Sequence, residues 1–208
     1  MLSLSLILIC YLLGSIPTAV WTSKVVYGFD IRTQGSGNAG ATNTFRVLGK
    51  KAGIFVLLFD IMKGVAGTSL AFLPDQIWQA GSVQGMMLLG LATVLGHIYP
   101  VFAGFKGGKG VATLLGMVLN IHPMAALICV GVFLGVFILF HYVSVGSMIS
   151  ALVFGSLVMA GFCGPADAAT KGLAILLVVL VVFTHRSNIR KLSEGREGKM
   201  YLWKRRTA

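Results

Sequence analysis

The feature that most constrains this chain is a series of long apolar runs, each ending in a short polar cluster. A helix needs about 20 consecutive apolar residues to cross a bilayer. Two runs reach that length, Leu2–Trp21 and Ile54–Leu73. The other runs are Met86–Phe102, Val111–Ile121, Met124–Phe140, Val145–Phe162 and Gly172–Phe183, several of them short. Only 11% of the 208 residues are charged, which is about half the share in a soluble domain. We therefore expect an all-α, polytopic integral membrane protein.

The placement of the basic residues predicts which loops face the cytoplasm. Of the 17 Lys and Arg residues, five lie in Lys24–Lys51, two in Lys106–Lys109 and eight in Arg186–Arg206. The intervening segments Pro74–Gln84 and Asn120–Pro123 carry none. By the positive-inside rule the three basic segments are cytoplasmic. The N-terminus is then outside and the C-terminus inside, which requires an odd number of crossings.

The number of crossings depends on Val111–Phe140, which is interrupted by Asn120-Ile-His-Pro123. One continuous span would give six crossings and an external C-terminus, against the charge pattern. A re-entrant hairpin would give five crossings, and two short helices give seven. We favour about seven transmembrane helices, some of them short, with His141–Ser147 back on the cytoplasmic side.

Composition and charge exclude several other classes. A net charge of +11 would suit nucleic acid, but the basic residues flank apolar runs and no nucleic-acid-binding module is recognisable. The C-terminal cluster is better suited to anionic lipid headgroups. The first run lacks the basic start of a signal peptide. Cys10, Cys129 and Cys163 have neither metal-ligand nor disulfide spacing. Residues 1–208 indicate one membrane domain, with no metal and no cofactor expected.

The second cytoplasmic segment contains a glycine-rich stretch, Phe105-Lys-Gly-Gly-Lys-Gly110, just before a predicted helix start at Val111. Glycines let the backbone bring N–H groups close to an anion, and a helix N-terminus favours phosphate. The residues concerned are Gly107, Gly108 and Gly110, with added charge from Lys106 and Lys109. The spacing is not that of a Walker A loop. The alternative is a flexible turn with two topology-setting lysines.

The first cytoplasmic segment, Gly35–Arg46, has the same character. Its glycines Gly35, Gly37 and Gly40 permit positive φ, and its polar side chains are Ser36, Asn38, Thr42, Asn43 and Thr44. Arg46 can bind a phosphate through two parallel hydrogen bonds. The alternative is a helix-capping loop with Thr42 or Asn43 as the N-cap.

The third segment, Thr184–Lys199, is mostly suited to a basic juxtamembrane tail. His185 and Asn188 are exceptions, because they lie about one helical turn apart at the membrane boundary. Three glycine- or Asn/Arg-rich segments on one membrane face predict a composite phosphate site.

These segments resemble the three motifs of the acyl-phosphate:glycerol-3-phosphate acyltransferases, the PlsY family. The matching stretches are Gly35–Asn43, Gly96–Phe102 with Phe105–Thr113, and Asn188–Leu192 with Gly195–Glu197. The resemblance covers nearly the whole chain. It departs from the family pattern at Tyr99, where Phe is usual, and at Lys191, where Arg is usual.

The resemblance implies transfer of a fatty acyl group from acyl-phosphate to the 1-hydroxyl of sn-glycerol 3-phosphate, at the cytoplasmic face of a bacterial inner membrane. The products are lysophosphatidic acid and inorganic phosphate. It implies the catalytic residues Ser36, Arg46, Lys106, His185 and Asn188. The substrate-binding residues that we expect beside them are Gly35, Gly37, Asn38, Gly40, Thr42, Asn43, Gly107, Gly108, Lys109 and Ser144, with the nearby Ser147 as the alternative to Ser144.

For the mechanism we expect direct attack by the glycerol hydroxyl, with no acyl-enzyme and with a substrate phosphate as proton acceptor. No His-x4-Asp pair is present, and acyl-phosphate is already activated, so that positioning and charge stabilisation suffice. A transporter of phosphorylated solutes is the alternative from another class. A CDP-alcohol phosphatidyltransferase would need an aspartate cluster, whereas the four aspartates lie far apart in the sequence.

Three further polar residues lie at or inside apolar runs. His97 belongs to the second motif, and a structural role that caps the loop is at least as well supported as a catalytic base. Asp60 and Lys63 are three residues apart in the second run. Charged residues are rare inside membranes, and we interpret them as a structural pair on one helix face.

Overall fold

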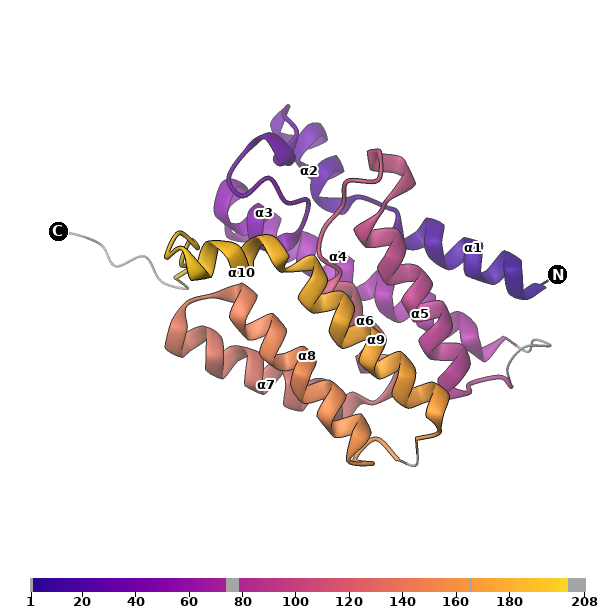
Figure 1. Cartoon of the computed structure of the whole chain (residues 1–208). Helices are drawn as coiled ribbons and strands as arrows, with labels where there is room; N and C mark the ends of the chain where they lie inside the picture. The colour runs from indigo at the N-terminus through magenta and orange to yellow at the C-terminus, as the bar shows by residue number, and fades with distance from the viewer. Residues whose placement is uncertain (1, 74–78, 165, 202–208) are drawn as a thin grey trace.

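The computed structural model describes residues 2–73, 79–164 and 166–201, and within these ranges all regular structure is helical (Figure 1). The expected all-α class is therefore confirmed. The α-helices are α1 (Leu2–Gly14), α2 (Thr18–Tyr27), α3 (Ala41–Leu48), α4 (Lys50–Ser69), α5 (Val83–Ile98), α6 (Val111–Ile121), α7 (Pro123–Phe140), α8 (Val143–Met159), α9 (Ala168–Thr184) and α10 (Arg186–Ser193). The 3₁₀-helices are η1 (Ile31–Thr33), η2 (Leu70–Phe72) and η3 (Val101–Ala103).

Among the described residues, four helical stretches are long and apolar enough to cross a membrane, and the bent pair α9–α10 can provide a fifth. The four are Leu4–Tyr27, Lys50–Phe72, Val83–Ala103 and Pro123–Phe140. Helices α6 and α8 are apolar but shorter. Between α9 and α10 the axis bends by 53°. The number of crossings, and the side of the membrane on which each end lies, stay predictions.

The interruption predicted in Val111–Phe140 is confirmed as a break between two helices. His122 ends α6 and caps α7, where its Nδ1 accepts the Ala125 N–H at 3.1 Å. Pro123 is the first residue of α7, a position where its missing N–H costs nothing.

Small residues let the helices approach closely. A Cβ on Gly64 of α4 would lie 2.0 Å from the Thr113 carbonyl oxygen of α6, and one on Gly116 would lie 2.0 Å from the Ile61 carbonyl oxygen. Close backbone contact through glycine is the usual way in which membrane helices pack. The crossing of α4 and α6 therefore requires glycine on both helices.

The polar segments gather at one end of the bundle (Figure 1). The α2–α3 loop, the α7–α8 turn and α10 lie at the end opposite the start of α1. Hydrogen bonds between the segments agree with this view, such as Met200 N–H to the His141 carbonyl at 2.9 Å. An odd number of crossings would place α10 and the N-terminal end of α1 on opposite faces in this way.

The orientation can be tested with single cysteines in a cysteine-free background. Gln34 and Ser193, both exposed, lie at the predicted cytoplasmic end, and exposed Gln79 lies in the predicted external loop. In intact cells, Gln79→Cys should react with an impermeant maleimide, while Gln34→Cys and Ser193→Cys should react only after permeabilisation. Labelling of Ser193→Cys in intact cells would contradict the odd-crossing topology.

Candidate active site

The loop between α2 and α3 is folded around the buried side chain of Asn43. Its Oδ1 accepts the Ser36 N–H at 2.9 Å, and its Nδ2 donates to the carbonyls of Ile31 and Gln34 at 3.2 and 3.1 Å. Asn43 is only 1% exposed. The structure thus places it beneath the loop as a support, and direct contact between this amide and a substrate stays a prediction.

Two of the three glycines in this loop have the expected backbone. Gly35 and Gly37 have φ of +59° and +74°. The expectation of positive φ is wrong for Gly40, whose φ is −137°. A Cβ on Gly40 would lie 2.9 Å from Asn38 Oδ1, the end of a side chain that can turn away. Gly40 also caps α3, and the alternative prediction of a threonine or asparagine cap is therefore wrong.

The second loop uses its glycines differently from the prediction. Gly107 N–H donates to the Ile98 carbonyl at 3.1 Å, and Gly108 N–H to the His97 carbonyl at 3.2 Å. Both N–H groups are taken up by the backbone, so the expectation that they face an anion is wrong. A Cβ on Gly107 would lie 2.0 Å from the His97 oxygen, which makes close approach the reason for this glycine. Gly110, with φ of +81°, leads into α6.

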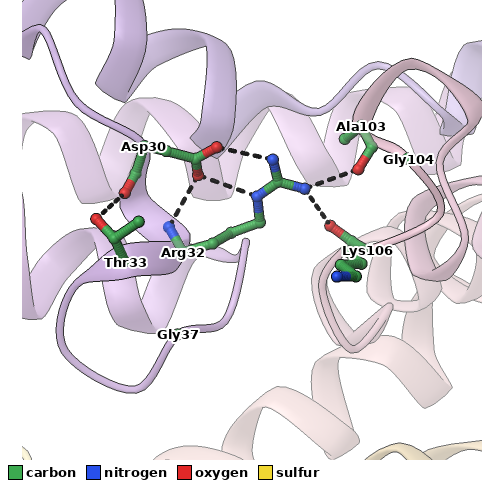
Figure 2. A pocket seen from close by; sticks show the side chains of 8 residues that line it. Asp30, Arg32, Thr33, Gly37, Ala103, Gly104 and Lys106 are labelled. Atoms are coloured by element: carbon green, nitrogen blue, oxygen red, sulfur yellow. Dashed lines mark hydrogen bonds and ion pairs between the residues drawn. The ribbon is translucent and has the colours of Figure 1, made fainter.

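Arg32 links the two glycine-rich loops (Figure 2). Its guanidinium donates to the Asp30 carboxylate at 2.7 and 3.0 Å, and to the carbonyls of Ala103 and Lys106 at 2.7 and 3.3 Å. Hydrogen bonding from Arg32 holds the pKa of Asp30 well below its usual range, so the pair is ionised at neutral pH. One loop is thereby fixed against the other.

A cavity of about 550 Å³ lies where the loops meet. Its lining residues are Asp30, Arg32, Thr33, Gly37, Ala103, Gly104, Lys106 and Gly107. The predicted residues Ser36 and Lys106 are both exposed. Within the described ranges, neither the Ser36 hydroxyl nor the Lys106 ammonium makes a side-chain hydrogen bond or ion pair with the protein. Both groups are therefore available to an anion at this end of the molecule.

A second polar cluster joins the start of α6 to α8 and α10. The Lys109 ammonium donates to Asn188 Oδ1. Asn188 Nδ2 and the Ser144 hydroxyl both donate to Glu197 Oε1, at 2.5 and 3.1 Å. The structure therefore brings Lys109, Asn188 and Ser144 together, as the sequence predicted, through a carboxylate that was not assigned to the site.

His185 lies beside this cluster, at the bend between α9 and α10, and is 2% exposed. Burial, together with the charge of Lys109, lowers the pKa of its imidazole to about 4, so the ring is neutral at pH 7. Its Nδ1 lies 2.8 Å from the Val181 carbonyl oxygen. Because a carbonyl only accepts, Nδ1 carries the proton and Nε2 is the acceptor nitrogen.

Arg46 is close to the same cluster from the side of α3. Its Nη2 donates to the Gly198 carbonyl at 3.4 Å, and its charge contributes to the lowered pKa of Lys109. The two loops also approach each other directly, since a Cβ on Gly40 would lie 4.0 Å from the Gly108 Cα. The predicted site residues thus form two neighbouring groups, one around the cavity and one around Lys109.

Comparison with known proteins relates this arrangement to a family. The family model described as glycerol-3-phosphate acyltransferase matches residues 4–195. A glycerol-3-phosphate acyltransferase of Enterococcus faecalis is 44% identical over 203 residues, covering 94% of this chain and 90% of the relative. One of Chlorobium limicola is 38% identical over 225 residues, covering 95% and 96%. The chain belongs to the glycerol-3-phosphate acyltransferase family.

Solved structures of the family share the fold. A crystal structure of PlsY, an integral membrane glycerol 3-phosphate acyltransferase, in its glycerol 3-phosphate form aligns with a TM-score of 0.85 and 40% identity, covering 97% of this chain and 96% of that one. The lysophosphatidic acid form of PlsY aligns with a TM-score of 0.82. The resemblance read from the motifs is confirmed, and this protein is an integral membrane member of the family.

Sequence reasoning missed the supporting carboxylates and Arg32. Asp30 and Arg32 directly precede the first glycine run, and Glu197 ends the third motif. Charged residues next to glycine motifs were the available signal. Their partners are far away in sequence, such as Ala103 for Arg32 and Ser144 for Glu197, and only the fold reveals them.

The ionisation of Lys109 gives a testable pH dependence. Burial lowers the pKa of this ammonium to about 8, so the side chain loses its positive charge as the pH rises through 8. A phosphate monoester is already dianionic there, since its second pKa is about 6. We expect kcat/KM to fall above pH 8 because an anion would lose a cationic partner. In Lys109→Arg the side chain stays protonated, so the fall in kcat/KM should begin at a higher pH. An unchanged alkaline limb would show that Lys109 does not control it.

Proposed function

We propose that this protein transfers a fatty acyl group from acyl-phosphate to the 1-hydroxyl of sn-glycerol 3-phosphate, giving lysophosphatidic acid and inorganic phosphate. The observation that carries the proposal is the presence of two separate cationic groups at one end of an apolar helix bundle. One lies at the cavity and includes Lys106, and the other is centred on Lys109. Two phosphate-bearing substrates would need two such groups. The PlsY forms with glycerol 3-phosphate and lysophosphatidic acid support the acceptor and the product.

The reaction is a direct transfer. The glycerol O1 attacks the acyl carbonyl carbon, the bond from that carbon to the phosphate oxygen breaks, and the hydroxyl proton passes to a phosphate oxygen. The protein orients the two substrates and stabilises the charge that develops on the carbonyl oxygen and the leaving phosphate. In this scheme Ser36, Arg46 and Lys106 contact phosphate, Asn188 donates or accepts hydrogen bonds, and the neutral His185 accepts one at Nε2.

The apolar surface of the bundle suits the acyl chain, since acyl-phosphate is a lipid with a polar head. We place the reaction at the cytoplasmic face of a bacterial inner membrane, where the basic loops and the soluble glycerol 3-phosphate meet. The basic segments of the sequence support this orientation.

A donor comparison tests the proposal. Purified protein is incubated with radiolabelled glycerol 3-phosphate and, in parallel, palmitoyl-phosphate, palmitoyl-CoA or palmitoyl-acyl carrier protein. Labelled lysophosphatidic acid should form with palmitoyl-phosphate alone and should be insensitive to EDTA. Comparable rates with palmitoyl-CoA would contradict the proposed donor, because its acyl carbon is bonded to sulfur and has no phosphate leaving group for the second cationic group.

A further inference from the structure

A charged cluster lies inside the helix bundle, on α4 and the end of α5. Asp60, Lys63 and His97 are 2%, 3% and 6% exposed. Asp60 Oδ1 accepts from Lys63 Nζ at 3.0 Å and from the Thr18 hydroxyl at 3.2 Å, and it lies 3.6 Å from His97 Nδ1. Lys63 Nζ also donates to the Ile16 carbonyl at 3.0 Å. The predicted Asp60–Lys63 pair therefore exists, and it extends to a histidine and to the break between α1 and α2.

Such a cluster is a poor means of stabilising a helix bundle. Removing two charges from water costs about as much as their attraction returns, and apolar replacements of similar volume are often as stable. Ionisable residues within membrane helices accordingly tend to have a role beyond packing. We therefore expect Asp60 and Lys63 to hold a segment of the protein in place.

His97 connects the cluster to the glycine-rich loop. A Cβ on Gly108 would lie 2.1 Å from His97 Nε2, so the edge of the ring rests directly on the loop backbone. The carbonyls of His97 and Ile98 accept the N–H groups of Gly108 and Gly107. One side of the imidazole thus faces Asp60, and the other side lies against the loop backbone at Gly108.

The far end of the loop is fixed from the same helix. Gly64, next to Lys63, packs against the Thr113 carbonyl in the first turn of α6, where a Cβ would lie 2.0 Å from that oxygen. The α4 segment around Lys63 therefore contacts both ends of the loop, through His97 before it and Thr113 after it. Lys106 and Lys109 lie between these two anchors.

We propose that Asp60, Lys63 and His97 form a buried positioning triad that sets the loop carrying Lys106 and Lys109 at the substrate phosphates. All three side chains are buried, so we assign them as positioning residues and not as residues that contact substrate. This inference rests on the proposed function, because it assigns a role within the same reaction.

Two variants test the triad without leaving a buried charge alone. Asp60→Asn/Lys63→Met removes both charges at similar volume. His97→Asn keeps a polar atom near Asp60 but removes the ring edge that faces Gly108. We expect each to raise the KM for glycerol 3-phosphate or palmitoyl-phosphate at least tenfold, since a misplacement of about 1 Å can cost up to about 100-fold. The detergent-solubilised protein should keep a cooperative thermal transition.

A matched control lies at the contact between α4 and α6, away from the loop. Asn120 of α6 donates to the Ser69 hydroxyl and the Val65 carbonyl of α4 at 3.0 and 3.5 Å. Asn120→Ala should lower the melting temperature with KM unchanged. When His97→Asn is combined with Asp60→Asn/Lys63→Met, KM should rise little beyond the larger of the two separate effects. The reason is that both changes disrupt the same support of the loop, so their effects are not additive.

The outcomes separate the two proposals. An inactive wild-type protein with palmitoyl-phosphate would refute the proposed function. An active wild type whose double variant and His97→Asn both keep KM within about twofold, a margin close to ordinary non-additivity, would refute the triad alone. Additive effects of the two changes would also refute it, and a raised KM in Asn120→Ala would show that any disturbance of the α4–α6 contact suffices.

Discussion

A Gly107→Ala variant is expected to lose at least about 100-fold in kcat/KM while the helices still form. The added Cβ would lie 2.0 Å from the His97 carbonyl oxygen and 2.7 Å from the Ile98 carbonyl oxygen, both of which belong to backbone and cannot rotate away. The loop must therefore move, and with it Lys106 next to the substituted residue. A displacement of about 1 Å in a positioning element costs on the order of 100-fold in rate.

The measurement is kcat/KM for both substrates, with helicity followed by far-UV circular dichroism. Gly131→Ala is the matched control, because a Cβ at this glycine of α7 would meet no atom within 4 Å. It should leave activity unchanged. Normal turnover by a well-folded Gly107→Ala protein would show that the loop is only a flexible turn.

The second large effect is expected from the two lysines of the same loop. Lys106→Ala and Lys109→Ala should each lower kcat/KM about ten- to a hundredfold, since each removes a charge-assisted contact worth roughly 1.5–3 kcal/mol. Lys109 is held by Asn188 within the second cluster, so its effect should equal that of Lys106. The structure thus argues against a purely topological role for this residue.

Lys51→Ala provides the control for net charge. Lys51 is exposed at the start of α4, near the same end of the molecule, and its loss should change kcat/KM less than about twofold, as for an ordinary surface charge. Equal losses in all three variants would mean that the basic face acts only through its overall field. Full activity of Lys109→Ala would remove the second cluster from the phosphate site.

The helices could be predicted because their signal is local. The Pro123 break and the start of α6 at Val111 follow from neighbouring residues, and the structure confirms them. The run Leu2–Trp21 was expected to be continuous and is instead divided between α1 and α2. The roles of individual glycines were harder to predict, since the same residue serves left-handed backbone and close packing. Gly110 has positive φ, whereas Gly107 and Gly108 are required by contact with His97 and Ile98.

The arrangement of the site depends on contacts that no local pattern encodes. The motifs named the right segments, yet Arg32 reaches Ala103 and Glu197 reaches Ser144 across most of the chain. Asn43 shows the same limit, because its place in a motif suggested contact with substrate but did not reveal that its side chain also supports its own loop. Residue type indicated polarity, and only the fold distinguishes a group that supports the site from one that faces it.

The most direct test of the account is a rapid-quench experiment with radiolabelled palmitoyl-phosphate. The enzyme is mixed with the donor, with and without glycerol 3-phosphate, and quenched within one turnover. Direct attack predicts label in lysophosphatidic acid only when the acceptor is present, and none on the protein at any time. A protein-bound acyl group that forms and decays as fast as the product appears would contradict direct transfer and require an enzyme nucleophile.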